Sequence, residues 1–150
     1  MVLDDILGHT RVRDGLKTAA ATDTVHHAML FSGPDGVGKS TVAKAFAALA
    51  ACPTPTSTGD ACGSCRSCDR ILNHVTGEET RHPDVLWLSP QSSAVIKIAQ
   101  VRNLLGIIPY PPLEARVRTV IIEPADALNV EAANALLAKE SGSDWSDDED

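Results

Sequence analysis

The fold is decided by the stretch Gly33-Pro34-Asp35-Gly36-Val37-Gly38-Lys39-Ser40-Thr41. It fits the phosphate-binding pattern G-x-x-x-x-G-K-[ST], with Gly33, Gly38, Lys39 and Ser40 at the fixed places. Glycines let successive backbone N–H groups turn toward a phosphate, where a Cβ would block the approach. In this pattern Lys39 reaches the β- and γ-phosphates, and the Ser40 hydroxyl takes one position on Mg²⁺.

The segments on either side of this loop support the same interpretation. Residues 28–32 are a short apolar run that predicts a buried strand, and the Ala-rich residues 41–51 predict a helix. The helix N-terminus adds its positive dipole end to the anion site. A glycine-rich turn with a solvated lysine is the weaker interpretation. The sequence therefore predicts a nucleoside triphosphate site at Gly33, Gly36, Val37, Gly38, Lys39, Ser40 and Thr41, with Mg²⁺ at Ser40.

Composition sets the outer limits on class and location. A chain of 150 residues with 43% apolar content suits one domain with its own core. It has no apolar run of about 18 residues and no secretory signal at its start, so no membrane span and a cytoplasmic location are expected. Residues 140–150 hold six of the 20 acids and predict a disordered acidic tail. The remaining 14 acids nearly balance the 13 bases, so charge argues neither for nor against nucleic-acid contact.

The rest of the chain alternates helical and strand patterns. Helices are predicted at 5–22 with a break at Gly8, and at 69–74, 98–108 and 130–139. Further strands are predicted at 85–88 and 117–122. This order predicts an α/β fold with a parallel sheet covered by helices on both faces.

The four cysteines predict a metal site. Cys52 is followed by Cys62, Cys65 and Cys68 in a C-x-x-C-x-x-C pattern, and there are no others. In a cytosolic chain such clustering favours a metal over disulfides, and four thiolates suit a closed, structural Zn²⁺ site. His74 or His82 in place of Cys52, an iron–sulfur cluster, and four buried thiols are the alternatives.

A phosphate loop followed by a cysteine insertion resembles the clamp-loader ATPases of bacterial DNA polymerase III. These AAA+ proteins comprise the gamma/tau and delta-prime subunits, and the matching segments run from about residue 3 to 137. They are Gly8-His9, residues 26–33, the loop through Thr41, the four cysteines, His82-Pro83-Asp84 and residues 134–137. His82-Pro83-Asp84 is more similar to delta-prime. The resemblance implies a three-layer P-loop core over 1–139, incomplete at its C-terminus, with a zinc-binding insertion at 52–82 and the tail at 140–150.

The resemblance also implies a role, with one departure. Family members open the ring-shaped sliding clamp and place it on primed DNA during replication, so the implied partners are gamma/tau and delta subunits, the clamp and primer-template DNA. The implied cofactors are ATP, Mg²⁺ and Zn²⁺. Where the family's ATPases carry Asp-Glu after the third strand, this chain has Glu123 and Pro124. Glu123 is a weak catalytic candidate, Pro124 offers no base and Asp126 is poorly placed, so ATP binding with weak or absent hydrolysis is expected.

Two other functions and one question about chain length stay open. An active gamma/tau-like ATPase and a P-loop kinase of a small metabolite are the alternatives, although a kinase would not need the cysteines. The family continues after Leu137 with Lys-Thr-Leu-Glu-Glu-Pro, whereas this chain has Ala138-Lys139-Glu140. The chain is either a natural product or a truncated or frameshifted fragment. If it ends at Asp150, its P-loop strand is an open edge, and we expect a fragment that is marginal or insoluble when expressed alone.

Overall fold

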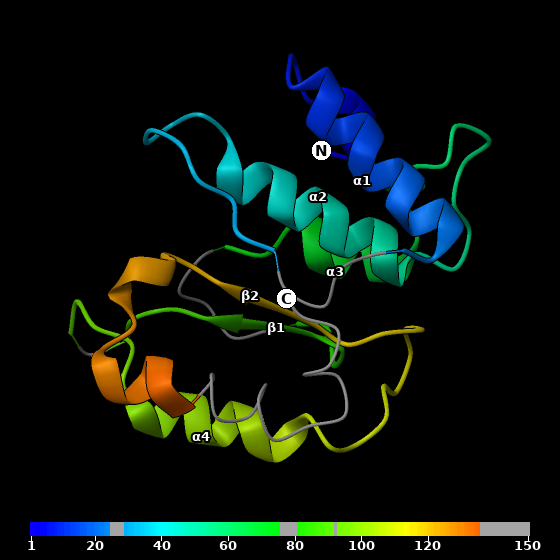
Figure 1. Ribbon diagram of the computed structural model, residues 1–150. Coiled ribbons are helices and arrows are strands. Elements are labelled where there is room, and N and C mark those ends of the chain that lie inside the picture. The colour runs from blue at the N-terminus through cyan, green and yellow to red at the C-terminus, as the bar shows by residue number, and fades with distance from the viewer. Residues whose placement is uncertain (25–28, 76–80, 92, 136–150) are drawn as a thin grey trace.

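The computed structural model describes residues 1–24, 29–75, 81–91 and 93–135. Two strands lie in the middle, with α1, α2 and α3 on one side and α4 on the other (Figure 1). The α/β prediction is confirmed in these residues. The helices are α1 (Thr10–Thr22), α2 (Lys39–Ala51), α3 (Arg66–Leu72) and α4 (Ile98–Ile107), the strands are β1 (Val85–Leu88) and β2 (Thr119–Ile122), and two short 3₁₀ turns are η1 (Leu3–Asp5) and η2 (Ala125–Ala127).

The two strands form a parallel pair, as the sequence predicts. The register runs from Val85 opposite Thr119 to Leu88 opposite Ile122. Side chains of a strand alternate between the faces of the sheet, so each strand serves both layers of helices. Val85 and Ile121 face the α1–α3 layer, whereas Leu88 faces α4. Cover on both faces explains why both strands are almost continuously apolar.

Two apolar clusters hold the helices to the sheet. In α2 the alanines let the backbone approach its neighbours closely, and the larger Phe46 and Leu49 fill the remaining space. The buried apolar members of the first cluster are Leu3, Ile6, Leu16, Val42, Ala45, Phe46, Ala47, Ala48, Leu49, Ala51, Cys52, Ala61, Cys68, Ile71 and Val85. Those of the second are Leu88, Ile96, Val101, Leu104 and Ala132. None of the described helices is long and apolar enough to cross a membrane.

The prediction of a strand at 28–32 is wrong for residues 29–32, which are the part that the structure describes. Residues 29–32 have no regular secondary structure, and the Leu30 side chain is 77% exposed. A strand needs a neighbour for its backbone hydrogen bonds, whatever its propensity. The described sheet consists of β1 and β2 alone, and neither pairs with this segment. Residue 28 lies outside the described residues.

Most other boundaries agree with the predictions within a few residues. The break at Gly8 is confirmed, because Gly8 and His9 both have left-handed backbones (φ 74° and 53°) that separate η1 from α1. α3 begins at Arg66 rather than at 69, since the Cys65 Sγ accepts the Cys68 N–H and caps the helix. Residues 130–135 are helical, and residues 136–150 of the last predicted helix and tail lie outside the described part.

Candidate functional site

The phosphate-binding pattern forms a loop that leads into the first turn of α2. Gly36 and Gly38 have left-handed backbones (φ 81° and 105°), which glycine adopts at little cost. Gly38 is the N-cap of α2, and its carbonyl accepts the Val42 N–H at 3.0 Å. A Cβ built on either glycine meets nothing within 4 Å. The sequence therefore needs glycine here for backbone conformation rather than for space.

Lys39 closes this loop. Its Nζ donates to the Gly33 carbonyl at 2.7 Å, so the ammonium group joins the end of the loop to its start. The first turn of α2 contains no acidic side chain, which leaves the positive end of the helix dipole available to an anion. Ser40 is half-buried beside Lys39 and Thr41 is exposed. The predicted phosphate ligands thus lie together on one loop and one helix start.

The weak catalytic candidate lies at the carboxyl end of the sheet. The Glu123 N–H donates to the Leu88 carbonyl at 3.0 Å, which extends the parallel ladder by one residue beyond β2. Pro124 follows and leads into η2, which contains Asp126. Figure 1 shows the start of α2 and the carboxyl ends of both strands on the same side of the molecule. In open α/β sheets this edge is where ligands bind.

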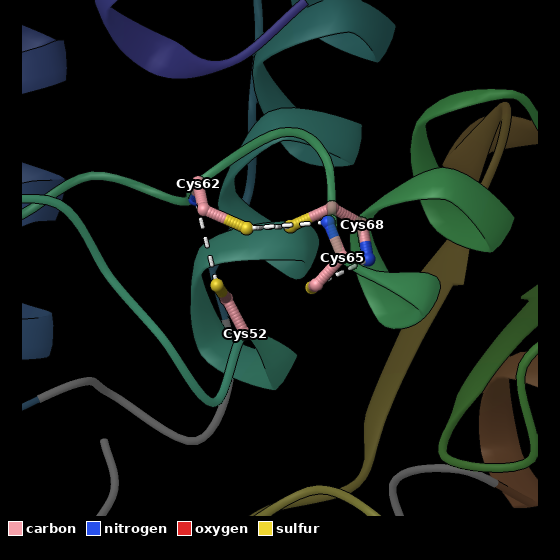
Figure 2. Close-up of side chains that lie close together, drawn as sticks. All are labelled: Cys52, Cys62, Cys65 and Cys68. Atoms are coloured by element: carbon pink, nitrogen blue, oxygen red, sulfur yellow. Dashed lines mark hydrogen bonds between the residues drawn. The ribbon is translucent and has the colours of Figure 1, made fainter.

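The four cysteines converge, although the first lies ten residues before the other three. Their sulfur atoms all lie within 4.8 Å of one another, and all four thiols are free (Figure 2). The Cys62 and Cys68 sulfurs are 3.9 Å apart. Four bonds of about 2.3 Å in a tetrahedron place sulfurs about 3.8 Å apart, so the donor set and its spacing fit one Zn²⁺ ion. The spacing suits a single ion better than a cluster of several irons.

Local backbone structure holds these sulfurs in place. Cys52 is the C-cap of α2 and Cys65 is the N-cap of α3. The Cys62 N–H donates to the Cys52 sulfur at 3.4 Å, and the Cys65 N–H donates to the Cys62 sulfur at 3.3 Å. Such N–H donors stabilise thiolates and orient metal ligands.

The thiols differ in acidity because their surroundings differ. The Ser64 backbone N–H, the Thr54 hydroxyl and the Cys65 backbone N–H together lower the pKa of Cys62 to about 5. Burial raises the pKa of the Cys68 thiol. A thiolate is therefore ready at neutral pH to attract a cation, and ligation of the buried thiol releases a proton.

Among the described residues, the structure brings the four cysteine sulfurs together and places neither His74 nor His82 with them. The His74 ring stacks on Trp87, with centroids 4.4 Å apart and planes 10° from parallel. The His82 Nε2 lies 3.2 Å from the Ser67 hydroxyl, and its Nδ1 accepts the Asp84 N–H at 3.0 Å. Burial, with the nearby Arg70 charge, lowers the pKa of His82. Both rings have other contacts, with Trp87 for His74 and with Ser67 and Asp84 for His82, so Cys52 is the fourth candidate ligand.

Comparison with known proteins assigns the chain to a family. Residues 8–139 match the family described as DNA polymerase III, delta subunit. The chain belongs to this family. It is 38% identical over 112 residues to DNA polymerase III subunit delta' of Pseudomonas aeruginosa, a match that covers 74% of this chain and 32% of that protein.

Relatives of a second kind match a longer part of the chain at lower identity. DNA polymerase III subunit tau of Escherichia coli is 32% identical over 133 residues, which are 89% of this chain and 19% of that protein. Subunit tau of Bacillus subtilis is 28% identical over 134 residues, again 89% of this chain and 22% of the relative. The chain thus spans about a third or less of the length of these relatives.

Sequence reasoning missed the structural role of Asp84. Its buried carboxylate accepts the N–H groups of Leu113, Glu114 and Ala115 at 2.8, 2.6 and 2.7 Å, and the Arg118 guanidinium lies 3.7 Å away. Burial alone would raise the pKa of Asp84, but these N–H donors outweigh it and hold the pKa below its usual value. An acid placed directly before a buried strand was the available signal.

Proposed function

We propose that this chain is the nucleotide-binding part of a clamp-loader subunit of DNA polymerase III, of the delta' kind. The observation that carries the proposal is the glycine loop closed by Lys39 at the start of α2 in a chain of this family. In this proposal the loop holds ATP and Mg²⁺, and the four cysteines hold Zn²⁺. Residues 1–139 then form part of an AAA+ core with three layers, and 52–82 form its zinc-binding insertion.

The same proposal assigns weak or absent hydrolysis to the site. Phosphoryl transfer to water needs a polar side chain that orients the water, and the apolar ring of Pro124 cannot do this. Glu123, one residue earlier, is left to act on the water shell of Mg²⁺. Such a subunit would serve as an assembly component of the loader. Its partners would be the tau/gamma and delta subunits, and through the complex the sliding clamp and primer-template DNA.

Binding of ATP is tested with a fluorescent ATP analogue and Mg²⁺. We expect the wild-type chain to bind it and Lys39→Ala to bind at least about tenfold more weakly, since a charge-assisted phosphate contact is lost. Arg102→Ala is the matched control, because it removes an exposed positive charge from α4, outside the loop. Failure of the wild-type chain to bind would overturn the proposal.

Hydrolysis is tested separately in a subunit that contains the remaining family domains. Pro124→Glu supplies the missing carboxylate, and Pro124→Ala removes the proline without supplying one. We expect phosphate release to rise in the first variant alone. If turnover does not rise with Pro124→Glu, the missing base is not what limits hydrolysis.

An active ATPase of the tau/gamma kind is the second candidate. The observation that favours it is the 89% coverage of this chain by tau relatives, against 74% by delta'. Rapid turnover by a wild-type subunit with its remaining domains would select this candidate over the first.

A further inference from the structure

A histidine outside the phosphate-binding pattern contacts the loop directly. His9 is the N-cap of α1, and its Nε2 lies 3.1 Å from the Val37 carbonyl oxygen. A carbonyl oxygen only accepts hydrogen bonds, so the His9 Nε2 carries the proton and donates it. The contact joins residues 28 positions apart and connects the start of α1 to the middle of the loop.

This contact fixes one peptide group of the loop. The peptide between Val37 and Gly38 is planar, and in a trans peptide the C=O and the N–H point in opposite directions. When His9 holds the Val37 carbonyl on one side, the Gly38 N–H is turned to the other. Gly38 is a fixed position of the pattern, where backbone N–H groups face the phosphates.

The loop needs such a restraint because of its glycines. Gly36 and Gly38 flank Val37, and glycine backbones rotate more freely than those of other residues. The Val37 N–H donates to the Pro34 carbonyl at 3.3 Å, and Lys39 holds the Gly33 carbonyl. Neither of these bonds involves the Val37 carbonyl, so in the described structure the restraint on that group comes from His9.

We propose that His9 is a positioning residue of the phosphate site, which presets the Gly38 N–H for an incoming polyphosphate. The proposal rests on the proposed nucleotide binding and adds a determinant of it that lies 24 residues before the pattern begins. A donor that is already in place saves the ligand the cost of ordering this peptide, which is how preorganisation raises affinity.

The test compares His9→Ala with His9→Gln in the full 150-residue chain. Gln retains an N–H donor at a similar reach, and both variants place a non-glycine side chain on the same left-handed backbone. ATP and inorganic tripolyphosphate are the probes, each in competition with the fluorescent ATP analogue. We expect His9→Ala to weaken both probes by about fivefold, as for one lost hydrogen bond, and His9→Gln to stay within about twofold of wild type.

Tripolyphosphate separates positioning from contact with the base. Loss of affinity for ATP but not for tripolyphosphate would mean that His9 contacts the nucleoside, and it would overturn the proposal. Equal binding by wild type and His9→Ala would also overturn it. Circular dichroism melts of both variants check that the comparison is made on folded protein.

A second measurement keeps the proposal falsifiable if the wild-type chain fails to bind ATP. The backbone ¹⁵N heteronuclear NOE of Gly38 reports the order of this peptide in the protein without nucleotide. We expect the NOE to fall in His9→Ala and to be retained in His9→Gln. An unchanged NOE in His9→Ala overturns the positioning role, whereas absence of wild-type ATP binding overturns the proposed function.

Discussion

At the scale of single residues, buried polar groups fix the path of the chain around the sheet. Asp84 has no exposed surface and gathers three consecutive backbone N–H groups from the loop before β2. Arg118 donates to the carbonyls of Ile107, Tyr110 and Pro111 at 2.7, 2.7 and 3.1 Å, and so caps the end of α4. These two side chains hold the α4–β2 connection against the first strand.

Replacing Asp84 with Asn is expected to destabilise the chain by about 2–3 kcal/mol. The substitution removes the charge that strengthens the hydrogen bonds and turns an amide N–H₂ toward N–H donors. The measurement is urea denaturation followed by circular dichroism. Glu114→Gln is the control, because its ion pair with Arg70 lies on the surface and little change is expected. Equal stability of Asp84→Asn and wild type would contradict the role of this carboxylate.

The same carboxylate predicts a pH dependence. The folded-state pKa of Asp84 lies below its unfolded value, so its contribution to stability is complete above the unfolded pKa of about 4. It is lost as the pH falls through the folded pKa. We expect the difference in free energy of unfolding between wild type and Asp84→Asn to be constant from pH 5 to 8 and to shrink below pH 4. A difference that does not shrink in acid would contradict this assignment.

At the scale of elements, α2 joins the two candidate sites. Its N-cap, Gly38, belongs to the phosphate loop, and its C-cap, Cys52, belongs to the cysteine cluster. The helix is buried along most of its length against the first apolar cluster. One helix thus sets the distance between the phosphate-binding pattern and the cysteine cluster.

Removing the metal is expected to destabilise this end of α2. Where four thiolates hold an ion, the free energy of binding is part of the free energy of folding. We expect a strong chelator to lower the melting temperature of the metal-loaded chain by at least about 5 °C, and Cys62→Ser to melt at the lower temperature with or without chelator. Metal content by mass spectrometry accompanies each melt. If the chelator leaves the melting temperature of the metal-loaded chain unchanged, this result would contradict the zinc assignment.

The elements also show what the sequence can predict. Local pattern alone predicts β1 and α4, because β1 is a short continuous apolar run and the apolar residues of α4 recur at helical spacing. The segment at 29–32 is also mostly apolar, yet a strand needs a partner for its hydrogen bonds, and neither described strand pairs with it. The cysteine cluster was predictable from spacing. The contact from His9 to Val37 was not, since no motif relates residues 28 positions apart.

At the scale of the whole molecule, a sheet of two described strands separates two apolar clusters. The first lies under α1–α3 and includes Cys52 and Cys68, and the second lies under α4. Alternate residues of β1 and β2 enter each cluster. The two strands therefore connect the clusters, because each strand contributes side chains to both. If that link is strong enough, the two halves unfold together.

Two matched substitutions test whether they do. Ile71 in the first cluster and Ile96 in the second are both fully buried, 1% and 0% exposed, so Ile→Ala removes the same atoms from each. We expect each variant to lose about 2–4 kcal/mol and to shift one common transition. Trp87 fluorescence, in a Trp145→Phe background, reports the sheet, and far-ultraviolet circular dichroism reports the helices. Coincident transitions in both variants mean one cooperative unit, whereas an Ile96→Ala transition that leaves the Trp87 signal unmoved means that the α4 layer unfolds by itself.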